Sequence, residues 1–199
     1  MGEADLIPVQ ESPVDTERLL FEPNISINGP IDEKMLASFL EQIVKVRCGN
    51  QDLVLEINTI GGDADVARRI ALEVRLFRTH SGRRAFCIGK TFVYSAGLTI
   101  LASFKTANRY LTSDTVLLIH ERRISESLEL SGPMAACIQI VREKLSMLET
   151  GQRLERQGFE ELLEESRLSM TELFECAQAN CYLNAQDALA YGIIGNILA

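Results

Sequence analysis

The chain of 199 residues is 46% hydrophobic and 24% charged, values that are ordinary for a globular protein and exclude a disordered chain. Its length suffices for one domain with a substantial core. The formal net charge of −8 and a sequence isoelectric point of about 4.9 speak against binding to nucleic acid or to an anionic membrane surface, because both need a basic face.

No apolar run approaches the roughly 20 residues that a membrane-spanning helix needs. The opening residues, Met1 to Asp5, lack the basic start of a secretory signal. We therefore expect a soluble, cytoplasmic protein.

The five cysteines contain no Cys-x-x-Cys pair, and the chain has only two histidines. This spacing predicts neither a disulfide framework nor a zinc site, and we expect no cofactor. Free cysteines are usually buried, so most of the thiols should be small core residues. They are Cys48, Cys87, Cys137, Cys176 and Cys181.

Residues 1–23 contain scattered prolines and charges without a sustained period, which predicts an extended N-terminal arm. Residues 24–199 should form a single domain. Asn24–Asn28 is the first predicted strand, Asp32 then caps an amphipathic helix, and Leu53–Ile57 reads as a buried strand.

A glycine-containing turn follows, Asn58–Gly62, and Asp63 begins a helix that should reach about Phe77. Two glycines after a buried strand let the backbone approach a ligand and direct N–H groups at an oxyanion. Taken alone, the turn is more typical of a tight connection before a helix cap, because Gly-Gly before a helix is common.

Short apolar strands and helices continue to alternate, which indicates parallel βαβ crossovers and an α/β fold. The predicted elements are strand Arg84–Ile88, helix Ser95–Ala102, strand Asn108–Leu111 and strand Thr115–Ile119.

The pattern changes after His120. Arg122–Leu130 partly alternates and predicts an exposed strand, and Gly132-Pro133 begins an unusually long helix, to about Gly158, that could protrude. Ser169 with Glu172 forms a capping box, and Asn184 caps a last helix.

Ser95 stands where an apolar strand passes into an apolar helix, so backbone N–H groups and the helix dipole could stabilise negative charge beside its hydroxyl. The local alternative is an ordinary N-cap serine. The spacing does not match G-x-S-x-G.

His120 ends a strand at the rim of the predicted sheet, where open α/β folds assemble their sites. Histidine is the usual general base near neutral pH, although a single strand-end histidine is often structural. The other histidine, His80, lies in a polar stretch and should be solvated.

The order of these motifs is that of a known family. Strand-NTIGG-helix, strand-GKTFVYSAG-helix, LLIH, a long helix and YLNAQDALAYGII follow one another between about Ile25 and Ile197. The chain resembles the Clp protease proteolytic subunit of the Clp/crotonase superfamily. The resemblance implies a spiral of βαβ units with a protruding long helix, a Ser-His-Asp triad, and homo-oligomeric, heptameric rings. It also implies peptide or unfolded-protein substrates and a partner AAA+ ATPase.

The resemblance assigns Ser95 as nucleophile and His120 as general base, with the backbone N–H groups of Gly62 and Ala96 as oxyanion hole. The family's aspartate falls on Asn180, which could hold the imidazole but carries no charge. Asp187 and Glu175 are nearby carboxylates that could substitute, or could be solvated helix charges.

Other departures concern the surroundings of the site. The segment Gly89–Ser95, which leads to the candidate nucleophile, is two residues longer than is usual in the family. Ser-Ala-Gly replaces Ser-Met-Gly at the nucleophile. Ile60 stands where the family has a proline, and Glu121-Arg122 stand where it has Gln-Pro. The N-terminal arm also departs from the family pattern, which speaks against docking to an ATPase in the family's usual way.

Three functions remain open at this stage. The leading hypothesis is a serine endopeptidase that forms an acyl-enzyme at Ser95. The second is a weakly active or inactive Clp-like structural or regulatory subunit, which Asn180 favours. The third is a crotonase-type acyl-CoA enzyme.

Overall fold

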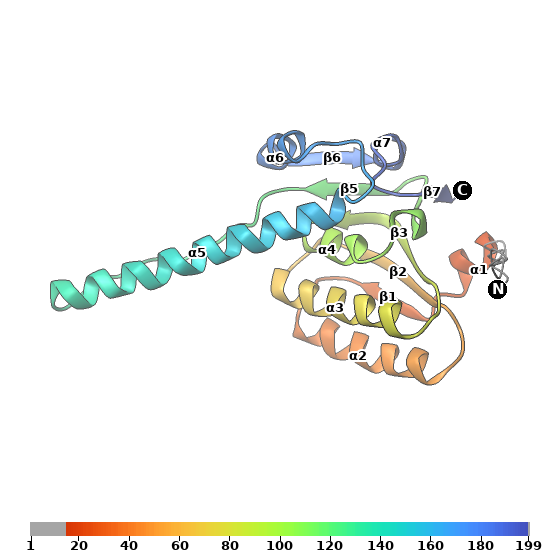
Figure 1. The fold of residues 1–199 in the computed structure, drawn as a ribbon, viewed down its shortest axis with the longest axis horizontal. Coiled ribbons are helices and arrows are strands. Elements are labelled where there is room, and N and C mark those ends of the chain that lie inside the picture. Colours follow the sequence, from red (N-terminus) through yellow and green to blue (C-terminus); the bar gives the residue numbers. More distant parts are fainter. Residues whose placement is uncertain (1–14, 199) are drawn as a thin grey trace, which may run out of the picture.

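The computed structural model describes residues 15–198, which fold into a seven-stranded sheet with helices packed against it (Figure 1). The strands run in the order β1-β2-β3-β4-β7, and β5 pairs with both β3 and β6. All these pairings are parallel except that of β5 with β6. The fold class is therefore the α/β class that the sequence predicts.

The strands are short, and most lie close to their predicted positions. They are β1 Ile25–Asn28, β2 Leu53–Thr59, β3 Ala85–Tyr94, β4 Arg109–Thr112, β5 Val116–Ile119, β6 Cys181–Asn184 and β7 Asn196–Leu198. The helices are α1 Thr16–Phe21, α2 Glu33–Cys48, α3 Ala64–His80, α4 Ala96–Ala102, α5 Met134–Leu162, α6 Met170–Gln178 and α7 Ala185–Ala190, with a short 3₁₀ turn at Thr106–Asn108.

Several helices begin at the predicted caps. The side chains of Asp32 and Asp63 accept backbone N–H groups in the first turns of α2 and α3. Ser169 and Glu172 form the reciprocal capping box of α6, and Asn184 caps α7. Each cap satisfies N–H groups that a helix start leaves without a partner, which is why these positions can be predicted locally.

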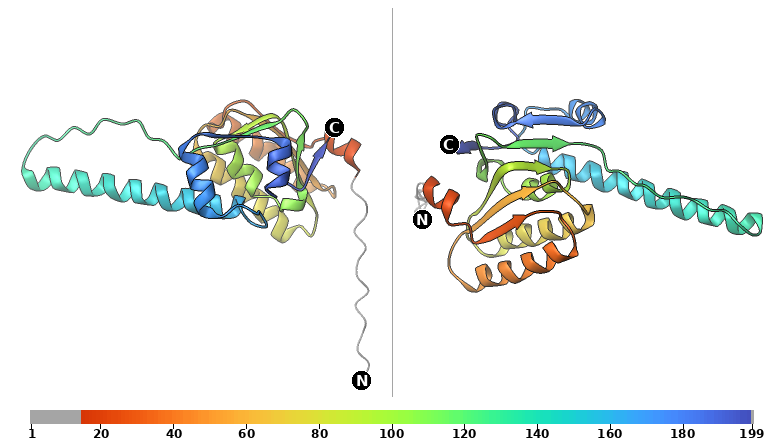
Figure 2. Two further views of the ribbon diagram at one scale, coloured as in Figure 1. Left: turned by 90° about the horizontal axis from the view of Figure 1, so that it is seen from above. Right: turned by 180° about the vertical axis from the view of Figure 1, so that it is seen from behind.

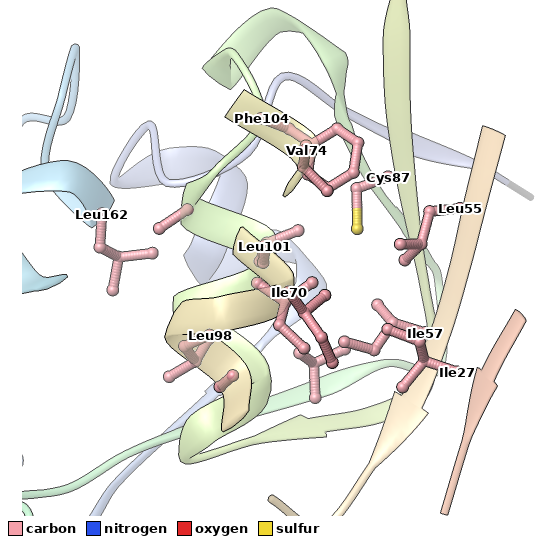
Figure 3. Close-up of a cluster of buried hydrophobic side chains, with 14 of the residues drawn as sticks. Ile27, Leu55, Ile57, Ile70, Val74, Cys87, Leu98, Leu101, Phe104 and Leu162 are labelled. Atoms are coloured by element: carbon pink, nitrogen blue, oxygen red, sulfur yellow. The ribbon is translucent and has the colours of Figure 1, made fainter. Parts of the chain in front are cut away.

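The main core lies between the sheet and α2, α3 and α4. Apolar side chains of β1, β2 and β3 meet those of α3 and α4, and Leu162 of α5 approaches from the other side of α4 (Figure 3). A smaller cluster on the sheet joins Val54, Phe86 and Ile88 to Leu19 of α1.

The predicted arm lies partly outside the described residues, which begin at residue 15. Within residues 15–23, however, Thr16–Phe21 is helical rather than extended, with Asp15 as its cap. Burial of Leu19 against the sheet accounts for this helix, because so short a segment is not stable alone.

Helix α5 is the longest helix and projects away from the sheet, as the sequence suggested (Figures 1 and 2). The chain leaves β5, runs out to the far end of α5, and the helix then returns to the body of the molecule. The strand predicted at Arg122–Leu130 is wrong: residues 120–131 form no regular structure, because none of the strands within residues 15–198 lies beside them to complete a ladder.

The expectation about cysteines is also wrong. Cys176 and Cys181 form a disulfide with Cα atoms 5.0 Å apart, and among the free cysteines only Cys87 is buried, whereas Cys48 is exposed. The sequence could not show this pairing, because it depends on the turn between α6 and β6 that brings the two residues together.

Candidate active site

Ser95 lies between the end of β3 and the start of α4 in an unusual backbone conformation. Its φ of 53° and ψ of −117° lie in a region that residues with a side chain seldom adopt. The N–H of Ser95 donates to the carbonyl of Leu118 at 2.9 Å, and its side chain makes no capping hydrogen bond to α4. The ordinary N-cap alternative therefore fails, and the Ser95 hydroxyl makes no hydrogen bond with any other group in residues 15–198.

The two additional residues before Ser95 are absorbed as a bulge. Ile57 and Thr59 of β2 pair with Gly89 and Val93 of β3, so that two steps along β2 match four along β3. Thr91 in this bulge has a φ of 60°. Because the bulge takes up the additional length, β3 still ends directly before Ser95.

The Gly61-Gly62 turn packs against Ser95 and needs both glycines. A Cβ on Gly61, whose φ is 94°, would lie 2.8 Å from the Cβ of Ser95. A Cβ on Gly62, whose φ is 147°, would lie 2.3 Å from the carbonyl oxygen of Ile31. Glycine alone allows this close approach.

Two backbone N–H groups beside Ser95 remain available. In the turn, the N–H of Gly61 donates to Thr59 Oγ1 and that of Asp63 to the carbonyl of Ile31, while the N–H of Gly62 donates to no other group within residues 15–198. Ala96 is the first residue of α4, where an N–H has no acceptor inside the helix. Both groups are suited to stabilise an oxyanion.

His120 follows β5, next to the turn that carries Ser95. Its Nδ1 lies 2.6 Å from the carbonyl oxygen of Glu121. A carbonyl only accepts, so this contact places the proton of a neutral imidazole on Nδ1 and leaves Nε2 with its lone pair. That is the tautomer a general base requires.

Gly62, Ser95, Ala96 and His120 line one cavity of about 540 Å³. Its walls are the start of α3, the start of α4, the residues that follow β5, and the last turns of α5. The cavity thus brings together four of the five residues singled out from the sequence. Within residues 15–198, no hydrogen bond yet joins Ser95 Oγ to His120, and such bonds often tighten only when substrate binds.

Asn180, the fifth residue, does not line the cavity, and within residues 15–198 no hydrogen bond joins its amide to His120. The antiparallel β5–β6 ladder ends at the pair Ile119 and Cys181, which are the chain neighbours of His120 and Asn180. The amide oxygen of Asn180 instead accepts a hydrogen bond from Arg123.

The candidate substitutes for a triad carboxylate lie elsewhere. Glu175 is exposed on α6 and Asp187 is exposed in the first turn of α7, and neither lines the cavity. His80 is exposed at the end of α3. Residues 15–198 contain no cluster of three histidine, cysteine or acidic side chains arranged to hold a metal ion.

Sequence reasoning missed an ion pair at the cavity. Arg122 donates to both carboxylate oxygens of Asp65, at 2.9 and 3.4 Å, and its backbone N–H donates to Glu155 of α5. Hydrogen bonds from Arg122 hold the pKa of Asp65 below its ordinary value. These contacts tie the residues after His120 to α3 and α5.

A strand-to-helix turn that exposes a hydroxyl beside free N–H groups and an imidazole defines a class of protein, namely hydrolases that act through an activated nucleophile. Within that class, the chain belongs to the Clp protease family, whose model matches residues 10–199. It is therefore a peptidase of the Clp type.

Individual relatives are distant but match over most of their length. The chain is 26% identical over 183 residues to the ATP-dependent Clp protease proteolytic subunit of Streptococcus sanguinis, covering 91% of this chain and 87% of the relative. It is 25% identical over 175 residues to the corresponding subunit 2 of Pseudomonas aeruginosa, covering 87% and 80%. An asparagine-to-aspartate mutant of ClpP1 from Listeria monocytogenes shares the fold, with a TM-score of 0.69, 20% identity, and coverage of 92% and 95%.

Proposed function

We propose that the protein is a serine endopeptidase in which Ser95 is the nucleophile and His120 the general base. The observation that carries the proposal is the strained backbone of Ser95, which presents an uncapped hydroxyl in the same cavity as His120 and the N–H groups of Gly62 and Ala96. Strain of this kind persists only where the surrounding structure enforces it, and it is concentrated at functional sites.

The reaction has two halves. Ser95 Oγ attacks the peptide carbonyl carbon while His120 Nε2 takes the hydroxyl proton, and the N–H groups of Gly62 and Ala96 stabilise the oxyanion. The C–N bond then breaks, the leaving amine receives that proton from His120, and an acyl-enzyme remains on Ser95. A water molecule, activated by His120, attacks the acyl carbonyl and releases the second product.

Asn180 is the candidate for the third position of the triad. It directly precedes Cys181, which pairs with Ile119 at the end of the β5–β6 ladder, and its Oδ1 could accept the proton on Nδ1 of His120, although without a negative charge. In a serine triad, loss of that charge has cost about 10⁴ in turnover, so we expect modest activity.

The extended residues after His120 are suited to receive substrate. The N–H groups of residues 123–131 make no backbone hydrogen bond with another part of the described chain. An extended peptide could pair with such a segment by adding a strand, which would lead its scissile bond to Ser95. Peptides and unfolded proteins are the substrates this mode favours.

An oligomer is supported by the exposed apolar face of α5. The exposed side chains alternate at spacings of four and three residues, the pattern of a helix that packs along another helix. They are Met134, Ile138, Val141, Leu145 and Leu148, each at least 43% exposed. We propose a homo-oligomeric ring, heptameric as in the family resemblance.

A partner AAA+ ATPase is supported by the names of the relatives, which are proteolytic subunits of ATP-dependent proteases. None of the helices within residues 15–198 is long and apolar enough to cross a membrane. We propose a cytoplasmic location, where a disulfide such as Cys176–Cys181 would more often be transient than permanent.

Labelling with a fluorophosphonate, followed by mapping of the modified residue, tests the proposal. We expect modification at Ser95, no modification in Ser95→Ala, and a rate that falls by about 10²–10⁴-fold in His120→Ala. Ser113→Ala and His80→Ala replace exposed residues outside the cavity and serve as matched controls. Peptide hydrolysis that persists in Ser95→Ala would refute the mechanism, and absence of both labelling and hydrolysis from the assembled protein would favour an inactive subunit.

A further inference from the structure

Arg123 is a cavity residue to which neither the sequence patterns nor the proposed reaction gives a role. It lies three residues after His120 and lines the same cavity as Ser95. Its one hydrogen bond within residues 15–198 runs from Nη2 to Oδ1 of Asn180, at 2.5 Å. No carboxylate in the described part of the chain pairs with Arg123, in contrast to the neighbouring Arg122, which pairs with Asp65.

The backbone of Asn180 is already fixed by its surroundings. Its φ of 56° is left-handed, a conformation that asparagine tolerates better than most residues. The Cys176–Cys181 disulfide closes the turn that contains it, and the β5–β6 ladder begins at the next residue. These backbone contacts do not fix the rotation of the side-chain amide.

That rotation matters for asparagine and not for aspartate. Both oxygens of a carboxylate accept hydrogen bonds, whereas an amide accepts only through Oδ1 and donates through Nδ2. If the amide turned by half a revolution, it would present a donor to the imidazole N–H. A triad with asparagine in the third position therefore needs a group that fixes the amide.

We propose that Arg123 is a positioning residue that fixes the amide of Asn180 for the proposed peptidase reaction, on which this inference rests. A guanidinium has only donors, so it can bind Oδ1 and never Nδ2. Oδ1 has two lone pairs, and the bond from Arg123 uses one of them. The second lone pair remains for Nδ1–H of His120. In this structure Nδ1–H donates to the carbonyl of Glu121, so it would have to exchange that acceptor for Oδ1 of Asn180.

A cation beside Asn180 also changes what an aspartate there would do. Arg123 would pair with an aspartate at position 180 and neutralise the charge that otherwise stabilises the imidazolium. The effect of removing Arg123 should therefore depend on which residue occupies position 180.

The test compares Arg123→Ala in the natural chain and in Asn180→Asp, measuring the labelling rate of Ser95 and the kcat and KM of peptide hydrolysis. In the natural chain we expect kcat and labelling to fall about tenfold, with KM changed by less than roughly twofold. Arg123→Lys, which keeps a donor, should recover part of the loss. In the Asn180→Asp chain, Arg123→Ala should cause no loss or should raise the rate.

Arg122→Ala is the matched control, because Arg122 also lines the cavity but does not contact Asn180. Its effect should be the same in both backgrounds. Equal losses from Arg123→Ala in both backgrounds would show a structural role and overturn the inference. A higher rate for Arg123→Ala in the natural chain would also overturn it, because Arg123 would then be an inhibitory contact.

Failure of the proposed function is recognised separately. If the natural protein is never labelled at Ser95, the serine mechanism fails, and urea unfolding of Arg123→Ala, Asn180→Ala and the double variant still measures whether the two side chains interact. Coupling in unfolding without any labelling would assign the contact to structure alone and overturn the positioning role.

Discussion

The nucleophile side and the base side of the candidate site are built in different ways. The nucleophile side, formed by Gly61, Gly62, Ser95 and Ala96, is held by main-chain hydrogen bonds and by close contacts between backbones. The base side, formed by His120, Arg122, Arg123 and Asn180, is held by side-chain contacts, and three of these four residues are exposed.

This difference determines how each side can be disturbed. Main-chain hydrogen bonds do not titrate, so the nucleophile side should respond to added volume and hardly to salt or pH. Exposed ion pairs contribute little to stability and are screened by salt. The base side should therefore respond to charge, to redox state and to pH.

The largest effect is expected from Gly61→Ala on the nucleophile side. The new Cβ would meet the Cβ of Ser95 at 2.8 Å and the carbonyl oxygen of Tyr94 at 3.0 Å, so Ser95 must move. A displacement of about 1 Å at a reacting group can cost about 10²-fold in rate, and we expect at least this loss in the labelling of Ser95. Gly82→Ala is the control, because Gly82 also has a positive φ of 66° but nothing lies within 4 Å of its added Cβ. Equal labelling of the two variants would contradict the steric account.

The second-largest effect is expected from Arg109→Lys. Arg109 binds the end of α4, the helix that begins directly after Ser95. Arg109 is fully buried and donates to five carbonyls. They belong to Ala102 at the end of α4, Phe104 just beyond it, Glu161 and Leu162 at the end of α5, and Ile193. Burial lowers the pKa of this guanidinium to about 10, so it stays charged at neutral pH.

A lysine has three donors in a different geometry and would leave buried carbonyls without partners, each costing about 1–3 kcal/mol. We expect the free energy of unfolding in urea to fall by about 3 kcal/mol. The exposed Arg142→Lys should leave it unchanged, and a similar small change in both variants would disprove the proposed role of Arg109.

Much of the fold follows from local chemistry. The caps at Asp32, Asp63, Ser169 and Asn184 were predictable because each cap is set by a few neighbouring residues. The strand predicted at Arg122–Leu130 failed for the opposite reason: alternation alone does not supply the partner strand that a ladder requires.

The same distinction applies to the candidate site: positions set by a local pattern could be predicted, whereas contacts between side chains distant in sequence could not. Ser95, His120 and the Gly61-Gly62 turn could be noted because each follows a predicted strand, and parallel strands bring such positions to one edge of the sheet. The resemblance to the Clp family, and not the local pattern, assigned the backbone N–H groups of Gly62 and Ala96. The contact between Arg123 and Asn180 could not be predicted, because it joins side chains 57 positions apart without any periodic signal. The roles of these residues stay predictions until Ser95 is labelled.

On the base side, the largest effect should come from loss of the disulfide. Reduction, or Cys176→Ser, reopens a short loop, and the entropy of loop closure corresponds to about 2 kcal/mol of stability. We expect a lower midpoint of thermal unfolding and slower labelling of Ser95, because Asn180 lies within this loop. Dithiothreitol should lower the midpoint of the natural protein and of the control Cys48→Ser, but not that of Cys176→Ser. An identical midpoint with and without reductant would show that the disulfide does not stabilise the fold.

The smallest effect is expected from Asp65→Asn, which removes the ion pair with Arg122. Because the pKa of Asp65 is lowered in the folded protein, its contribution is complete above the ordinary aspartate pKa of about 3.9 and is lost as pH falls through the lowered value. Both side chains are partly exposed, so the contribution to unfolding should be about 0.5 kcal/mol or less.

Urea unfolding of the natural protein and of Asp65→Asn, measured between about pH 7 and pH 3, checks the sign, because the difference between them should shrink only on the acid side. Labelling of Ser95 in Asp65→Asn should also lose part of its salt dependence, since the residues after His120 are no longer tied to α3 by charge. The defect of Gly61→Ala, by contrast, should be the same at every salt concentration. If salt altered both defects equally, the separation into a backbone-held nucleophile side and a charge-held base side would be wrong.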